Sequence, residues 1–196
     1  MKKLFFTLVC FCFVLTGAVA QTAQGSLTFG GAISYTSATQ ETPTQDAKSH
    51  SFQFIPSAGY FVIDNLAVGV NLGLSTSENS ANTKTNNFLV GPFARYYVFT
   101  ANEKFAFTGE AGLLFGNGKT TPAIGNELKT SSVNFYLSPG FTYFFTESWG
   151  LDFQLEGISF TSTDPNKNAD NDKRNSVTVG ANFFNPSLGF RYYIGR

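Results

Sequence analysis

The sequence is poor in charge, in histidine and in cysteine. Only 13% of its 196 residues are charged, against about 25% in a typical soluble domain. The 13 basic and 13 acidic residues balance, so nothing indicates a nucleic-acid partner. Both cysteines, Cys10 and Cys12, lie near the N-terminus, which leaves the rest of the chain without thiols for a disulfide or a thiolate metal site. With His50 as its one histidine, the sequence predicts no metal and no cofactor.

Residues 1–20, "MKKLFFTLVCFCFVLTGAVA", have the pattern of a signal peptide. Lys2 and Lys3 form a basic start, residues 4–15 are apolar, and the small residues 18–20 resemble a cleavage site. Lipid attachment is not favoured, because Val9 and Phe11 before the two cysteines are large. No other apolar run is long enough for a membrane-spanning helix. We therefore expect export, with a single domain at 21–196.

Aromatic residues are abundant, at 16% of the chain, and most of them recur at alternate positions. This period of two, interrupted by polar stretches, predicts antiparallel strands. The expected connections alternate between short turns at 63–65, 100–103 and 146–148 and long polar loops at 38–49, 77–86, 117–132 and 162–176. The predicted strands number eight and cover residues 26–37, 50–62, 66–76, 87–99, 104–116, 133–145, 149–161 and 177–194.

The two faces of these strands differ in character. One face carries large apolar and aromatic residues, and the other carries mostly Gly, Ala, Ser, Thr and Asn. A soluble sandwich or lipocalin-like barrel would turn its polar face to water and would carry many Lys and Glu there. Small side chains instead suit a narrow lumen. We therefore predict an all-β, eight-stranded antiparallel up-and-down barrel with its apolar face toward lipid, and keep the soluble barrel as the alternative.

In this pattern the chain resembles the small eight-stranded outer-membrane barrels of the OmpA/OmpX type and the broad outer membrane protein beta-barrel domain family. The resemblance is carried by the N-terminal segment, the strand pattern over 25–196 and the final strand "LGFRYYIGR". It implies the outer membrane of a Gram-negative bacterium, contact with outer-membrane lipid, and folding by the barrel-assembly machinery. The usual terminal aromatic is missing, because Gly195 and Arg196 follow Ile194.

Five charged residues fall on the inward face by strand parity. A lone charge in a narrow, low-dielectric lumen is costly, so opposite charges there should pair and form hydrogen bonds. The resemblance agrees, since small barrels of this type carry lumenal ion pairs. The expected lumenal charge network consists of Arg95, Glu110, Asp152, Glu156 and Arg191. Two interpretations remain open: a polar plug, or a gate for protons or ions.

Every second expected strand, namely 50–62, 87–99, 133–145 and 177–194, has a pair of aromatic residues near its C-terminal end. Parity sends the first member of each pair to lipid, where an amphipathic ring suits the headgroup boundary. The second members, Phe61, Tyr97, Phe144 and Tyr193, should crowd the periplasmic mouth of the lumen and oppose an open pore. The expected aromatic girdle consists of Tyr60, Tyr96, Tyr143, Trp149 and Tyr192.

The same four strands each contain a proline, at Pro56, Pro92, Pro139 and Pro186. Proline cannot donate a ladder hydrogen bond, and a closed barrel has no edge strand to accommodate it. We therefore expect a bulge or a locally unpaired carbonyl beside each one.

The sequence gives little support for catalysis. A hydrolase needs a base beside its nucleophile, and Ser49 and Ser51 should point to the face opposite His50 in a strand. The Asp- and Asn-rich stretch 163–175 also contains Lys167, Lys173 and Arg174, which favours a hydrated loop over a Ca²⁺ site. The expected function is a non-enzymatic barrel for envelope structure or surface interaction through the four long loops. The alternatives are a porin-like passage for small or hydrophobic molecules and a lipid-modifying enzyme that depends on His50.

Overall fold

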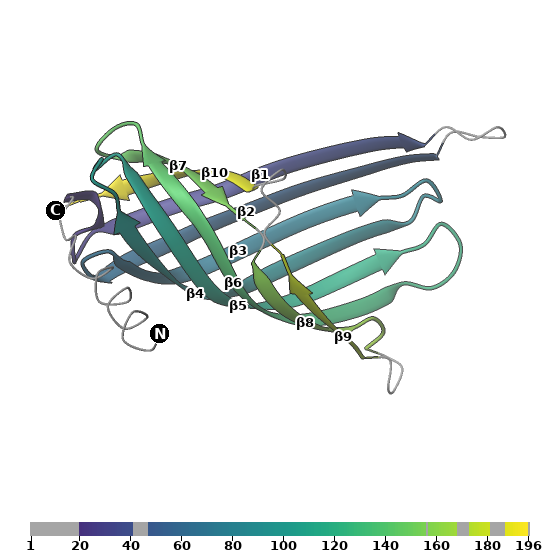
Figure 1. The fold of residues 1–196 in the computed structure, drawn as a ribbon. Helices are drawn as coiled ribbons and strands as arrows, with labels where there is room; N and C mark the ends of the chain where they lie inside the picture. The colour runs from purple at the N-terminus through teal and green to yellow at the C-terminus, as the bar shows by residue number, and fades with distance from the viewer. Residues whose placement is uncertain (1–19, 41–46, 156, 168–172, 181–186, 196) are drawn as a thin grey trace, which may run out of the picture.

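The computed structural model describes residues 20–40, 47–155, 157–167, 173–180 and 187–195. Within them, no helix is long and apolar enough to span a membrane. A short 3-10 turn, η1 (Ala20–Thr22), precedes the strands (Figure 1). The strands are β1 (Leu27–Gln40), β2 (Ala47–Ile63), β3 (Leu66–Glu78), β4 (Lys84–Phe99), β5 (Phe105–Thr121), β6 (Leu128–Phe144), β7 (Trp149–Gln154), β8 (Ile158–Asp164), β9 (Arg174–Val179) and β10 (Ser187–Ile194).

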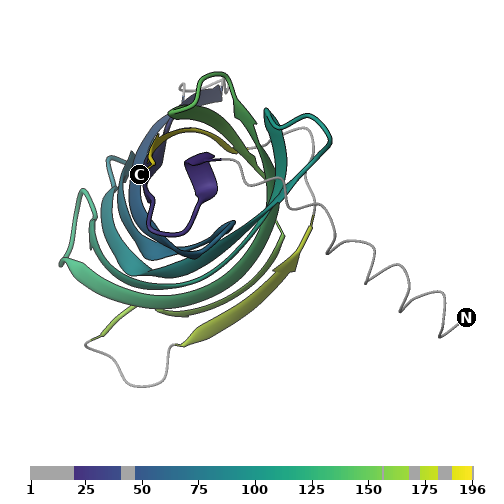
Figure 2. The same ribbon diagram turned by 90° about the vertical axis from the view of Figure 1, so that its left-hand side faces the viewer.

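The strands close into an eight-membered antiparallel ring. Strands β1 to β7 pair in chain order, and β10 joins β7 to β1. Strand β8 continues along β6 beyond β7, and β9 pairs with β8. The short turns lie at one end of the barrel, here called the short-turn end (Figure 1). Figure 2 views the barrel from this end. The predicted eight-stranded up-and-down barrel is confirmed.

Two of the predicted strands are each divided in two. Expected strand 149–161 becomes β7 and β8, because the register shifts by one residue between the pairs Gly140–Gln154 and Leu137–Ile158, which is the shift of a β-bulge. This bulge reverses the parity beyond it, so Ile158 and Phe160 are exposed. Expected strand 177–194 becomes β9 and β10. Val179 and Leu188 are both exposed, so the outward positions change parity between β9 and β10; residues 181–186 lie outside the described ones.

The expected long loops are wrong in extent, because strand pairing continues well into them. Within 38–49, β1 and β2 pair as far as Gln40 and Ala47. In the other three loops, the outermost strand pairs are Glu78–Lys84, Thr120–Leu128 and Thr163–Arg174. Beyond the membrane both faces of a strand meet water, so the hydrophobic alternation that marks a strand in the sequence disappears while the hydrogen-bond ladder continues.

Large apolar side chains cover the outside of the barrel. Exposed outward positions include Leu74 at 50%, Phe107 at 56% and Phe190 at 61% of the residue's reference area. The inward positions of the same strands are small, polar or buried. This inversion of the usual soluble pattern is the arrangement of a lipid-facing barrel, as the alternation predicts.

The prolines interrupt the ladder on one side of their strands. Pairing of β2 with β3 skips Pro56, and pairing of β4 with β5 skips Pro92, but the register is the same on both sides of each gap. Pro139 alone faces a bulge, the one at 155–157, and its carbonyl accepts from the Leu155 amide at 2.9 Å. A bulge is therefore only one of two ways in which this barrel accommodates proline. Pro186 lies outside the described residues.

Candidate functional site: the barrel lumen

Four of the five predicted charges meet inside the barrel. Arg95 on β4 donates from Nε to Glu110 Oε2 on β5 at 2.6 Å, and from Nη1 to Asp152 Oδ2 on β7 at 2.6 Å. Arg191 on β10 donates from Nε to the same Asp152 oxygen at 2.7 Å. All four side chains are buried. We call these four residues the charge network; Glu156 lies outside the described residues.

The network joins strands that are not neighbours. Arg95 and Glu110 are direct partners across β4 and β5, as the parity predicts. The contact from Arg95 to Asp152, however, crosses the lumen to β7, past β5 and β6. The two arginines and the two carboxylates of the network have equal and opposite charge, so these four residues add no net charge to the interior.

Polar side chains that parity reasoning did not single out complete the hydrogen bonding of both carboxylates. Tyr136 donates from its hydroxyl to Glu110 Oε1 at 2.6 Å, and Asn71 donates to the Tyr136 hydroxyl at 2.7 Å. Thr142 donates to Asp152 Oδ1 at 2.6 Å. Each carboxylate oxygen therefore has a donor, which is the condition under which buried ion pairs are tolerated.

Glycines make room for the largest members of this group. Gly112 is the cross-strand partner of Tyr136, and a Cβ at Gly112 would overlap the tyrosine ring. Gly30 pairs with Arg191, and a Cβ there would lie 3.0 Å from Arg191 Cζ. A glycine opposite an inward-facing large polar residue is thus the sequence signal that could have identified Tyr136 as part of the site.

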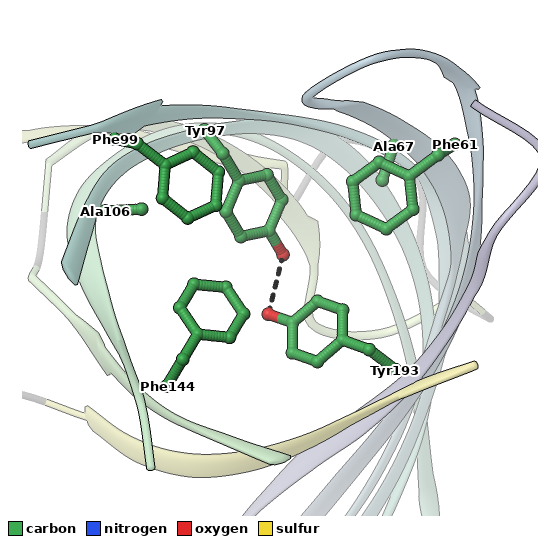
Figure 3. Packing of buried hydrophobic residues seen from close by; sticks show 7 residues of the cluster. All are labelled: Phe61, Ala67, Tyr97, Phe99, Ala106, Phe144 and Tyr193. Carbon is green, nitrogen blue, oxygen red and sulfur yellow. Dashed lines mark hydrogen bonds between the residues drawn. The ribbon is translucent and has the colours of Figure 1, made fainter. Parts of the chain in front are cut away.

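A second layer of side chains points into the lumen nearer the short-turn end. Phe61, Tyr97, Phe99, Phe144 and Tyr193, here called the aromatic layer, are all at most 5% exposed and point into the ring (Figure 3). The Phe144 and Tyr193 ring centroids are 5.1 Å apart, and the hydroxyls of Tyr97 and Tyr193 are 3.3 Å apart. The sequence predicts four of these five as the residues that crowd this mouth of the lumen, and Phe99 is an additional member of the layer.

The segment before β1 lies across the mouth beyond this layer. In Figure 2, η1 lies within the outline of the ring. Thr22 is fully buried and donates from Oγ1 to Asn65 Oδ1 at 2.6 Å. The Asn65 amide donates to the Thr22 carbonyl at 2.8 Å, and the Gly25 amide to the Phe61 carbonyl at 2.9 Å. These bonds hold the segment against the β2–β3 turn.

The five predicted girdle residues all lie on the outer surface at the short-turn end. Trp149 is 44% exposed and packs on Tyr192, with ring centroids 4.9 Å apart. Tyr60, Tyr96 and Tyr143 are 41% to 46% exposed. Their contact with a membrane interface stays a prediction.

The comparisons with known proteins agree with this architecture. The family model described as "Outer membrane protein beta-barrel domain" matches residues 6–183. The chain belongs to this family. No curated protein matches the sequence.

Solved structures similar to this family member include small barrels from two bacterial groups. Neisserial surface protein A is 18% identical, with a TM-score of 0.48, covering 86% of this chain and 97% of its own. The outer membrane protein OprG from Pseudomonas aeruginosa is 12% identical, with a TM-score of 0.46, covering 91% of this chain and 100% of its own. The N-terminal barrel domain of Pseudomonas aeruginosa OprF is 18% identical, with a TM-score of 0.41, covering 87% and 98%.

In this outer-membrane barrel, His50 is not part of a catalytic arrangement among the described residues. Its Nδ1 lies 3.3 Å from the Tyr35 hydroxyl, and the two rings stack. Glu78 is its cross-strand partner, an alignment the sequence did not reveal, but the Glu78 carboxylate lies 3.7 Å from Lys84 Nζ. In the described part of the chain no hydrogen bond links the His50 ring to a serine or a carboxylate. Nor do any three His, Cys, Asp or Glu residues there form a metal cluster.

A cavity lies on the other side of the charge network from the aromatic layer. It has a volume of about 470 Å³ and is lined by residues that include Asn71, Tyr136, Gln154 and Arg191. Arg191 Nη1 is buried and has no hydrogen-bond partner among the described residues. Leu155 also lines this cavity, although parity assigned it to the lipid face, because the bulge at 155–157 changes the alternation.

Proposed function

We propose that this protein is an integral outer-membrane barrel with a closed lumen, which serves envelope structure or surface interaction through its outer hairpins. The observation that supports the proposal is that the charge network and the aromatic layer place buried side chains in the lumen at two successive levels. An ion would have to separate buried ion pairs and then displace packed rings, both of which are costly.

Electrical recording tests the closed lumen. Purified protein in planar lipid bilayers should give no steady open current, while an established open porin in the same bilayers serves as the control for insertion. Heat-modifiable migration on gels would show that the protein was folded before insertion. A steady conductance that a lumen-blocking reagent abolishes would overturn the proposal.

Genetic complementation separates the two roles within the proposal. A deletion strain would receive either the wild type or a barrel whose hairpin tips, residues 79–83 and 122–127, are replaced by short turns. If envelope resistance to detergent is restored by both, the role is structural. If only the wild type restores a surface phenotype, the hairpins act on a partner.

Passage of a small molecule is the second candidate, and the cavity of about 470 Å³ favours it. Liposome swelling with small neutral and anionic solutes tests this candidate, since the closed barrel should not admit them.

A further inference from the structure

A surface pocket outside the barrel carries an unusual arrangement of lysines. The pocket has a volume of about 510 Å³ and is lined by residues of β2 to β6 at the long-loop end, together with Lys167. Lys119 on β5 and Lys129 on β6 are direct cross-strand partners. Like charges placed directly opposite each other destabilise a sheet unless an anion lies between or beside them.

A third lysine reaches the same place from the connection after β8. The Lys167 amide donates to the Lys129 carbonyl at 2.9 Å, and Lys167 Nζ donates to Asn117 Oδ1 at 2.8 Å. Among the described lining residues Glu127 is the one acidic residue, and it pairs with Lys119 at 2.5 Å. These described residues thus carry three positive charges and one negative charge.

The strand register shows how far these lysines lie from the outward apolar residues of the same strands. On β5, Phe115, Asn117 and Lys119 occupy successive outward positions, and on β6 so do Val133, Ser131 and Lys129. The lysines therefore lie two outward positions beyond Phe115 and Val133, the last apolar residues on the outward face of the two strands. The nearby pocket residues Leu74 and Phe88 are 50% and 44% exposed.

From this arrangement we infer that the pocket binds the phosphate headgroup of an anionic lipid in the outer leaflet, with the acyl chains lying along the exposed apolar strand faces beside it. Lysine ammonium groups bind phosphate as point charges. Basic side chains beside a membrane surface each add substantially to binding of anionic lipid. The inference goes beyond the proposed function and does not depend on whether the lumen is closed.

Native mass spectrometry of the full barrel, titrated with diphosphorylated lipid A in micelles, measures this binding. Replacing all three lysines, as Lys119→Gln, Lys129→Gln and Lys167→Gln together, should weaken binding by roughly tenfold to a hundredfold. The matched control is Lys84→Gln, a lysine at the same end that does not line the pocket; it should change binding less than about twofold. Equal loss in both variants, or no loss in the triple variant, would overturn the inference.

Two further experiments test whether the ligand is negatively charged and whether it is a lipid or a free phosphate ion. Glu127→Gln removes a carboxylate that competes for Lys119, so it should leave lipid binding unchanged or make it tighter; weaker binding would contradict an anionic ligand. Inorganic phosphate should not compete at concentrations far above those of the lipid. Displacement of the lipid by free phosphate at comparable concentration would mean an ion site and would overturn the lipid assignment. Heat-modifiable migration confirms that each variant is folded.

Discussion

Asp152 Oδ2 accepts hydrogen bonds from both Arg95 and Arg191, at 2.6 and 2.7 Å. A single carboxylate oxygen thus connects β7 to β4 across the lumen and to β10 beside it. Without this carboxylate, two buried guanidinium groups would lie close together with Glu110 as the remaining acid of the network. Asp152 is therefore the residue on which the charge balance of the interior depends most.

Asp152→Asn should lower the free energy of unfolding by about 3–5 kcal/mol, because it removes one partner of a buried ion pair and leaves the other charges uncompensated. Urea unfolding in detergent micelles, followed by gel migration, measures the change. Glu103→Gln, at an exposed position in the β4–β5 turn, is the matched control and should change stability by less than about 0.5 kcal/mol. Equal stability of the two variants would contradict the assigned role of Asp152.

Tyr136→Phe should destabilise the barrel by about 1–3 kcal/mol, because the hydroxyl both donates to Glu110 and accepts from Asn71, and both groups are buried. The same urea series measures it. Tyr143→Phe removes a hydroxyl from an exposed outward position and should have a smaller effect. Asn71→Ala should lower the free energy of unfolding less in the Tyr136→Phe background than in the wild type. If it lowers it equally in both, the three residues do not act as one network.

Gly112→Ala should destabilise the barrel by about 1–3 kcal/mol, because the added methyl group would overlap the Tyr136 ring and move its hydroxyl from Glu110. Gly109→Ala, on the same strand, provides the control, since nothing lies within 4 Å of a Cβ there. That variant should be neutral or slightly stabilising. A cost at Gly109 as large as at Gly112 would show that strand flexibility, and not space for Tyr136, explains the glycine.

The alternation of the sequence predicted the barrel and the inward position of Arg95, Glu110, Asp152 and Arg191, because each strand has two faces and one of them is apolar. It could not predict which charges meet. The pair Arg95–Glu110 follows from neighbouring strands, whereas Arg95–Asp152 depends on the width of the lumen, which is a property of the closed ring.

Parity reasoning also fails wherever the period of two is broken. One extra residue at 155–157 moved Leu155 from the expected lipid face to the lumenal cavity. The hairpin lengths were underestimated for a related reason: Lys119 and Lys129 pair in a strand region that has no apolar face to mark it. Because the sequence predicts a loop at 117–132, it does not predict that these two lysines face each other across two strands.

Trp149 provides a direct test of the aromatic girdle, because it is the one tryptophan of the sequence. If its exposed ring lies at the headgroup boundary beside Tyr192, lipids brominated near the headgroup should quench its fluorescence more strongly than lipids brominated near the chain ends. Acrylamide in the aqueous phase should quench it weakly compared with free tryptophan. Quenching by acrylamide as strong as in water, with no effect of brominated lipid, would place this end of the barrel outside the membrane and would restore the soluble alternative.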